Sequence, residues 1–252
     1  MTDHITRHQD GYVLTLTIAR PERKNALTQA MYGALADALV AADSDPSIRV
    51  TIITGEGDMF TAGNDLGDFS SGMPAGKPPV QRFLEAIRDL QKPLLAAVNG
   101  PAIGVGLTML LHCDIAYASE TANFRAPFTQ LGLVPEAGSS LLLPATVGNS
   151  MANEILLAGR ILSAAEALDC GLVSRVVPAA DLHAAITACA SAIAASAPTA
   201  IRQSKRLIRL NKKAIRDQMA AESIVFADQL KSREFREAAT AFAEKRKPVF
   251  PD

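Results

Sequence analysis

The stretch LLAAVNGPAIGVGL, residues 94–107, places a short apolar run directly before a turn rich in glycine. Residues 94–98 are all apolar, which predicts a buried strand. Residues 99–101, Asn-Gly-Pro, predict a turn, and a helix is expected from about residue 105 to residue 112. The N–H groups of a helix's first turn lack internal partners, so they can stabilise an oxygen that gains negative charge. The alternative is that the glycines only permit tight packing of the helix against the strand.

The same succession of strand, loop and helix recurs on either side of this stretch. A helix is expected after Thr28 as N-cap, and Ser163 with Glu166 forms a predicted capping box. From residue 181 onward the pattern is almost wholly helical. We therefore divide the chain into an α/β core, residues 1–197, and a helical C-terminal part, residues 198–252. The remaining predicted elements are strands at residues 12–18, 50–54, 115–118 and 173–177 and a helix at residues 80–90.

A second loop with small residues, FTAGNDL at residues 60–66, follows the predicted strand at 50–54. Small side chains let a ligand approach the backbone closely, and a turn can direct free N–H groups at an anion. The alternative is an ordinary turn that contains glycine. Residues 70–79, rich in glycine and proline, are a candidate lid or pocket wall.

A third segment, LGLVPEAG at residues 131–138, contains an acid in a mostly apolar setting. Pro135 fixes its own φ and restricts Val134, so the backbone before Glu136 has little freedom. Burial would raise the pKa of Glu136, as a residue that takes and returns a proton requires. The alternative is a surface glutamate near a helix N-terminus.

The composition excludes several classes of partner. The chain has 25 basic and 26 acidic residues among 252, which disfavours nucleic acid or a membrane surface as the main partner. No apolar run reaches the roughly 18 residues of a membrane-spanning helix, and the polar start leaves no room for a signal or transit peptide. Cys113, Cys170 and Cys189 lack metal-ligand spacing, so we expect reduced cysteines, no metal site and a cytoplasmic protein.

Six segments in order carry a resemblance to a known family. They are RPERKNAL (residues 20–27), FTAGNDL (60–66), AVNGPAIG (97–104), CDI (113–115), the region 159–171, and FAEKRKPVF (242–250). Together they resemble the enoyl-CoA hydratase/isomerase (crotonase) superfamily over nearly the whole chain. The resemblance implies an α/β fold, a spiral of repeated ββα units with a helical C-terminal region that builds a homotrimer or a hexamer. It implies an acyl-CoA thioester as ligand and no separate cofactor, because coenzyme A is part of the substrate.

The resemblance also implies the site residues. The backbone N–H groups of Asn64 and Val105 would form an oxyanion hole, with Glu136 as the acid–base residue. Phe242 and Lys245 would reach a coenzyme A in a neighbouring subunit, although an ordinary helix end is the alternative. The other residues implied to contact coenzyme A or the acyl chain are Lys24, Ala62, Gly63, Asp65, Leu66, Phe69, Met73, Gly104 and Phe128, of which the lysine could be merely solvated and the apolar ones merely core.

Two departures from the family pattern bear on the reaction. Hydratases of this family carry two glutamates that handle water, and this chain has Thr108 and Phe128 at those places. The segments around Asn64 and Glu136 look like those of Δ3,Δ2-enoyl-CoA isomerases. The sequence therefore predicts an isomerase that moves a double bond from C3 to C2 through a dienolate. The alternatives are a hydratase, a ring-opening isomerase of an aromatic-derived CoA ester, and a non-catalytic homologue that binds coenzyme A or RNA.

Overall fold

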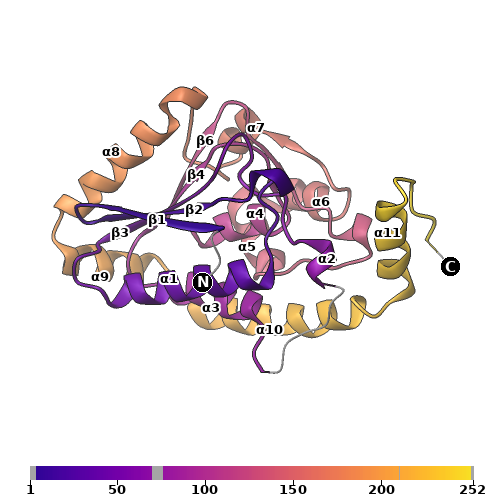
Figure 1. Cartoon of the computed structure of the whole chain (residues 1–252). Coiled ribbons are helices and arrows are strands. Elements are labelled where there is room, and N and C mark those ends of the chain that lie inside the picture. Colours follow the sequence, from indigo (N-terminus) through magenta and orange to yellow (C-terminus); the bar gives the residue numbers. More distant parts are fainter. Residues whose placement is uncertain (1–3, 70–75, 210, 251–252) are drawn as a thin grey trace.

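A six-stranded sheet lies at the centre of the computed structural model, which describes residues 4–69, 76–209 and 211–250 (Figure 1). Its strand order is β1-β2-β3-β4-β6-β9, with β1 antiparallel to β2 and every other pair parallel. The strands are β1 (Ile5–Asp10), β2 (Val13–Ile18), β3 (Val50–Gly55), β4 (Leu94–Val98), β6 (Ile115–Ser119) and β9 (Arg175–Val177). The prediction for residues 94–98 is confirmed, and every residue of β4 is buried.

A second, smaller sheet runs beside the first. It consists of β5 (Ala102–Ile103), β7 (Asn123–Arg125) and β8 (Leu162–Ser163). The chain passes from β4 directly to β5 and from β6 directly to β7, so each turn adds one strand to each sheet. An isolated parallel bridge between Thr61 and Ala102 extends this stacking to the turn before. The α/β spiral of repeated units implied by the resemblance is therefore confirmed.

Helices cover both faces of the six-stranded sheet. On one face, α8 (Leu182–Ala195) packs against Ile52 and Leu95, and on the other lie α1 (Gln29–Ser44) and α3 (Pro79–Asp89). Alternate strand residues face these two layers, as a sheet buried on both sides requires. The other α-helices are α2 (Leu66–Phe69), α4 (Val105–Thr108), α5 (Ser139–Val147), α6 (Asn149–Leu156), α7 (Ala164–Asp169), α9 (Pro198–Ile208), α10 (Lys212–Gln229) and α11 (Arg233–Ala243), with 3-10 segments at Pro21–Arg23, Met109–His112, Thr129–Leu131 and Ala179–Asp181.

The predicted helix caps are present, but one predicted helix is divided. The Thr28 hydroxyl accepts a hydrogen bond from the Met31 N–H, and Ser163 and Glu166 form the predicted capping box. The continuous helix expected over residues 105–112 is instead the single turn α4 followed by a 3-10 segment. The N–H groups of residues 107 and 108 both donate to the Gly104 carbonyl, so the helix is tightened from its start.

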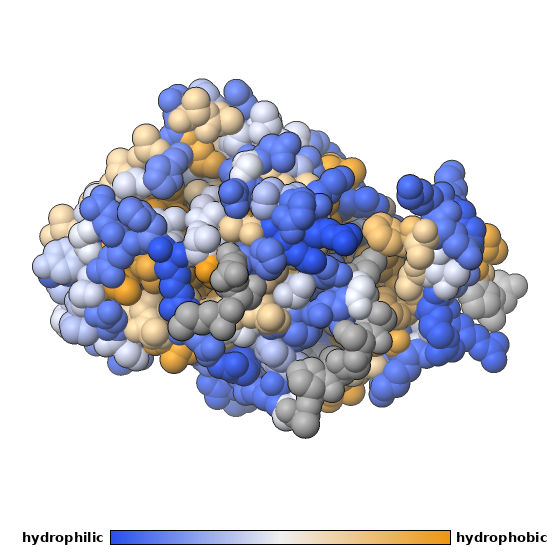
Figure 2. All heavy atoms as spheres, in the orientation of Figure 1, coloured by the Kyte–Doolittle hydropathy of each residue, from blue (hydrophilic) through white to orange (hydrophobic). Residues whose placement is uncertain are grey.

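The C-terminal helices pack back onto the core. Asp114, two residues after the 3-10 segment Met109–His112, accepts hydrogen bonds from Lys205 on α9 and from the Leu94 N–H, so α9 is tied to the start of β4. At the far end, Phe235 of α11 contacts Gly132 closely. The face shown in Figure 2 is mostly hydrophilic, with apolar side chains gathered where α11 meets the body. No single helix in the described ranges is long and apolar enough to cross a membrane.

Candidate active site

The parallel stacking of two turns brings the predicted oxyanion-hole residues to the same end of the spiral. Thr61 and Ala102 pair in parallel, and the Ile103 N–H donates to the Thr61 carbonyl at 3.0 Å. Asn64 and Val105 each follow their bridge residue by three positions. Within the part of the chain that the structure describes, neither of their N–H groups donates a hydrogen bond to another protein group. Two amides on neighbouring loops are thus without a protein acceptor among the described residues.

Glycines allow the two loops to approach this closely. A Cβ on Gly100 would lie 1.9 Å from the Asp58 carbonyl oxygen. Gly63 has a φ of +90°, and a Cβ there would lie 2.9 Å from the Ile103 carbonyl oxygen. Side chains at either position would force the loops apart. The glycines therefore do permit tight packing, which the sequence left as an alternative, and the same loops also carry the two free amides.

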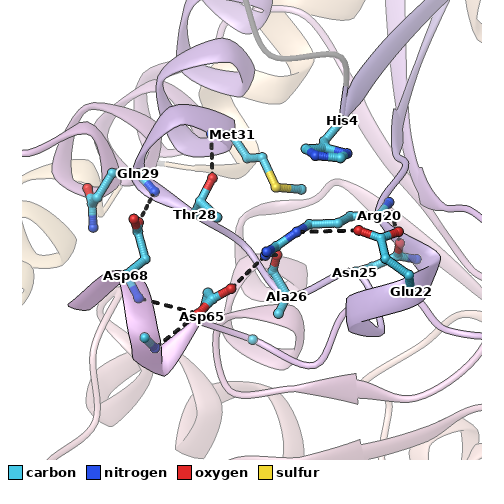
Figure 3. A network of polar contacts seen from close by, with 12 residues as sticks. His4, Arg20, Glu22, Asn25, Ala26, Thr28, Gln29, Met31, Asp65 and Asp68 are labelled. Atoms are coloured by element: carbon cyan, nitrogen blue, oxygen red, sulfur yellow. Dashed lines mark hydrogen bonds and ion pairs between the residues drawn. The ribbon is translucent and has the colours of Figure 1, made fainter. Parts of the chain in front are cut away.

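Polar contacts from α1 and its preceding loop hold the loop that carries Asn64 (Figure 3). The Arg20 guanidinium donates to the Asp65 carboxylate at 2.6 Å, and this contact lowers the pKa of Asp65. The Asp65 carboxylate also accepts the N–H groups of Gly67 and Asp68. The Asp68 carboxylate accepts the Gln29 N–H at 2.6 Å. These contacts assign the Asp65 side chain to supporting the loop, a role that the sequence did not reveal.

Glu136 lies against the helix turn that begins at Val105. Its Oε1 accepts a hydrogen bond from the buried Thr108 hydroxyl at 2.5 Å. Burial raises the pKa of Glu136 to about 7; the charge of Glu222 adds to the rise, and the bond from Thr108 opposes it. A carboxyl group with this pKa exists in both protonation states near neutral pH, which suits a group that takes and returns a proton.

Tyr32 connects the Asn64 side chain to the core, and no sequence signal pointed to it. It is fully buried on α1, and its hydroxyl donates to the Asn64 Oδ1 in a short hydrogen bond. Burial, and then the charge of Glu136, raise the pKa of Tyr32 well above its usual value. The phenol therefore stays neutral and fixes the residue whose N–H group faces the site.

Asn64 and Glu136 line one cavity of about 530 Å³ between α3 and α10. Its walls are largely apolar, with Leu84 from α3 and Met219 and Ile224 from α10. Charged residues stand among them, namely Glu85, Arg88 and Arg216. A ligand in this cavity would meet a largely apolar wall and the Glu136 carboxyl group. Sequence reasoning identified α10 only as a helix and did not foresee its place in this wall.

Several predicted coenzyme A contacts lie on or beside the loops that carry Asn64 and Val105. Exposed Lys24 adopts a left-handed conformation, and its carbonyl accepts the Ala62 N–H at 2.9 Å. Gly104 has a positive φ, and its N–H donates to the Arg125 carbonyl oxygen at 2.8 Å. The structure thus joins the residue 24 loop to the residue 62 loop beside the Asn64 amide.

The other predicted contacts lie elsewhere or outside the described atoms. Phe128 is buried in the main core, and it is not among the residues found to line the cavity. Phe242, at the end of α11, is 67% exposed, and Lys245 follows it in a left-handed conformation. The backbone of α2 is described, but the side chains of Leu66 and Phe69 are not, and Met73 and residues 70–75 of the candidate lid are outside the described ranges.

Metal-ligand chemistry has no counterpart in the described ranges. No group of three or more His, Cys, Asp or Glu residues there could hold a metal ion. His112 is buried and its Nε2 lies 2.7 Å from the Ala137 carbonyl oxygen. Burial lowers the pKa of His112 to about 4, so the ring is neutral at pH 7 and donates to this carbonyl. His112 therefore has a structural role, because it holds the backbone of the residue that follows Glu136.

Comparisons with known proteins agree on one family. The model of the enoyl-CoA hydratase/isomerase family matches residues 8–252. A solved structure of an enoyl-CoA hydratase/isomerase from Pseudoalteromonas atlantica T6c has a TM-score of 0.95 and 54% sequence identity, covering 99% of this chain and 100% of that one. The fold is therefore shared with that protein.

Characterised relatives carry more than one activity name. Enoyl-CoA delta isomerase 2 of Rattus norvegicus is 39% identical over 211 residues, which are 81% of this chain and 54% of the relative. This chain thus spans about half the length of that isomerase. The 2,3-dehydroadipyl-CoA hydratase of Escherichia coli (strain K12) is 36% identical over 244 residues, 94% of each chain. Similarity alone does not separate isomerisation from hydration.

Proposed function

The chain belongs to the enoyl-CoA hydratase/isomerase family, the crotonase superfamily, and within it we propose that it is an enoyl-CoA isomerase. The substrate is a 3-enoyl-CoA, and the product is the conjugated 2-enoyl-CoA. Coenzyme A enters as part of the substrate and no other cofactor takes part. The observation that carries the proposal is Glu136, one carboxyl group with a pKa of about 7 beside two free backbone amides.

The partner of Glu136 favours isomerisation over hydration. Hydration requires a second group that holds and activates water, which the family's hydratases supply as a glutamate. Here the corresponding position is Thr108, whose hydroxyl is buried and already donates to Glu136. The wall of the cavity that Glu136 lines is largely apolar. A single carboxyl group suffices when one proton leaves and returns on the same side of the substrate.

The reaction needs two steps that these groups can perform. The thioester oxygen accepts hydrogen bonds from the Asn64 and Val105 amides, which makes the C2 proton more acidic. The Glu136 carboxylate removes that proton, and the electron pair of the C2–H bond forms a double bond between C1 and C2, which gives a dienolate with its charge on the thioester oxygen and the C3–C4 double bond still in place. Glu136 then returns the proton to C4. The double bond has moved from C3–C4 to C2–C3, and no atom has been gained or lost.

Known magnitudes indicate what each part contributes. General acid–base catalysis by a positioned side chain accelerates reactions by roughly 100- to 10,000-fold. One oxyanion-hole donor contributes about 100- to 1000-fold. Because the Val105 donor is backbone N–H, the valine side chain does not interfere with it. Loss of Glu136 should therefore abolish most turnover while binding of the CoA thioester persists.

An activity comparison tests the proposal. Purified protein is assayed with a 3-enoyl-CoA for isomerisation and with crotonyl-CoA for hydration, together with Glu136→Gln and, as a matched control, Glu120→Gln on the exposed turn after β6. We expect isomerisation by the wild type and the control and its loss in Glu136→Gln. Hydration without isomerisation, or an active Glu136→Gln, would overturn the proposal.

A further inference from the structure

A buried carboxylate on the C-terminal helix α10 binds the segment that directly follows Glu136. Glu222 is 7% exposed, and its Oε2 accepts the Gly138 N–H at 2.5 Å. Its Oε1 accepts the Ser140 N–H at 2.9 Å and the Ser140 hydroxyl in a short bond. Gln218, one turn earlier on α10, donates to the same hydroxyl at 2.8 Å. All the hydrogen bonds that Glu222 makes with the described residues are thus directed to residues 138–140.

The backbone bound by Glu222 is in an unfavourable conformation. Ala137 has a φ of +61° and Gly138 a φ of +74°, so two successive residues are left-handed. A left-handed conformation is unfavourable for an L-residue such as alanine, because its Cβ crowds the following carbonyl oxygen, and it persists only where surrounding contacts impose it. His112 supplies one such contact through the Ala137 carbonyl, and Glu222 supplies the other through the next N–H group. The turn that fixes Glu136 is therefore held from two sides.

The packing of α10 adds to this restraint. A Cβ on Gly138 would lie 3.2 Å from the Met219 side chain, so the helix meets the turn without a gap. Met219 also lines the cavity beside Glu136. In Figure 1, α10 runs along the base of the molecule, below the elements that carry the hole. One helix therefore contacts both the turn that fixes Glu136 and the space for the ligand.

We propose that Glu222 is a positioning residue that sets the place of the Glu136 carboxylate through its hydrogen bonds to residues 138–140. The negative charge of Glu222 also favours the protonated form of Glu136. This inference rests on Glu136 being the acid–base group of the proposed function. Two like charges in a site with little water resist ionising together, so one of them keeps its proton to higher pH. Among the described residues, the Glu222 carboxylate accepts three hydrogen bonds and the Glu136 carboxyl group accepts one, from the Thr108 hydroxyl, so little offsets the cost of burying the Glu136 charge.

Other titratable groups also lie around Glu136, and their charges must stay the same in every variant that is compared. Tyr32 from α1 is neutral, and His112 from the 3-10 segment is neutral above its pKa of about 4. Glu85, Arg88 and Arg216 line the same cavity from α3 and α10. Burial raises the pKa of Glu136 most, and among the charged groups Glu222 is the one that raises it further.

The test uses variants that separate charge from contact. Glu222→Gln removes the charge at nearly constant size. Ser140→Ala keeps the charge and both N–H bonds but removes the hydroxyl contact. Asp217→Asn, an exposed residue on the same helix, is the matched control. The pKa of Glu136 is measured without substrate, from the carboxyl infrared difference between each protein and the same protein carrying Glu136→Gln. The pH profile of kcat/KM for a 3-enoyl-CoA is measured beside it.

We expect Glu222→Gln to lower the pKa of Glu136, to move the acid limb of kcat/KM to lower pH and to reduce kcat more than it changes KM. Because a 1 Å misplacement can cost about 100-fold, a loss of about 10- to 100-fold in kcat is expected. Ser140→Ala and Asp217→Asn should leave the pKa unchanged. An unchanged pKa in Glu222→Gln, or a kcat equal to that of Asp217→Asn, would overturn the inference.

Two further measurements keep the result interpretable. If Glu222→Gln does not fold, Glu222→Asp keeps the charge and withdraws the carboxylate by one methylene, and wild-type kcat in that variant would overturn the positioning role. The infrared titration needs no turnover. A wild type without isomerase activity would therefore refute the proposed function while the Glu222 result could still be read.

Discussion

Replacing Glu136 by glutamine should stabilise the folded chain at alkaline pH, in addition to removing activity. Burial raises the pKa of Glu136 from 4.5 to about 7, so the folded protein disfavours its ionised form. At roughly 1.4 kcal/mol per pH unit, that difference corresponds to ~3 kcal/mol. Glutamine resembles the neutral acid in shape and can still accept from Thr108. It therefore avoids the cost of the buried charge.

The sign of the effect depends on pH in a defined way. A carboxyl group whose pKa is raised on folding contributes its full stability below pH 4.5, where it is neutral in both states, and loses it as the pH rises through about 7. The gain from Glu136→Gln should therefore be absent at pH 4, grow between these values and be complete at pH 8. Because the side chain lines a cavity that water can enter, about 2–3 kcal/mol is expected, or a rise in Tm of on the order of 5 °C or more for a chain of this size.

The assay is thermal and urea unfolding of both proteins from pH 4 to pH 9 at equal protein concentration. Glu166→Gln provides a control of opposite sign. Hydrogen bonds from Ser163 and then Arg160 lower the pKa of Glu166 to about 2, so its carboxylate stabilises the fold above pH 4.5 and that contribution disappears as the pH falls through about 2. Glu166→Gln should thus be destabilised at neutral pH. A Glu136→Gln protein no more stable than wild type at pH 8 would refute the view of Glu136 as a buried acid.

Three other changes test separate parts of the structure. Thr108→Val removes the hydrogen bond that lowers the pKa of Glu136, so the acid limb of kcat/KM should move to higher pH, and an unmoved limb would contradict the contact. Gly100→Ala places a Cβ 1.9 Å from the Asp58 carbonyl oxygen, so we expect several kcal/mol of destabilisation by urea unfolding, with a near-neutral result refuting the close packing of the loops. Ser163→Ala removes the cap of α7 and should cost about 1 kcal/mol in the same assay, and a cost near zero would refute the capping box.

The sequence predicted those strands and helix caps that depend only on residues close together in the chain. The strand at residues 94–98, the cap at Thr28 and the capping box at Ser163 each follow from neighbouring residues, and all three are present. The strand β1 was not predicted, because an edge strand with only Ile5 buried shows no alternation of apolar residues. The short strands β5 and β7 were missed because their pairing joins segments far apart in the chain.

The site divides in the same way. The two glycine-containing loops and Glu136 were found from local composition and from the resemblance. The residues that hold these loops, Tyr32 and Glu222, were not found. Each lies within an ordinary helical pattern, where one tyrosine or one acid carries no signal of its contact. Each acquires its role only when a remote helix packs beside the site. Helical periodicity locates such residues on a helix but does not say which loop that helix will contact.

The parallel register that aligns Asn64 with Val105 also sets when this site can form during folding. The bridge from Thr61 to Ala102 and the approach of α10 to Gly138 both join segments far apart in the chain. Contacts of that kind form slowly, because the connecting chain must first be closed into loops. Regained helical content during refolding should therefore precede regained turnover. Catalytic activity would then report the last stages of folding, and partly folded chains would be inactive.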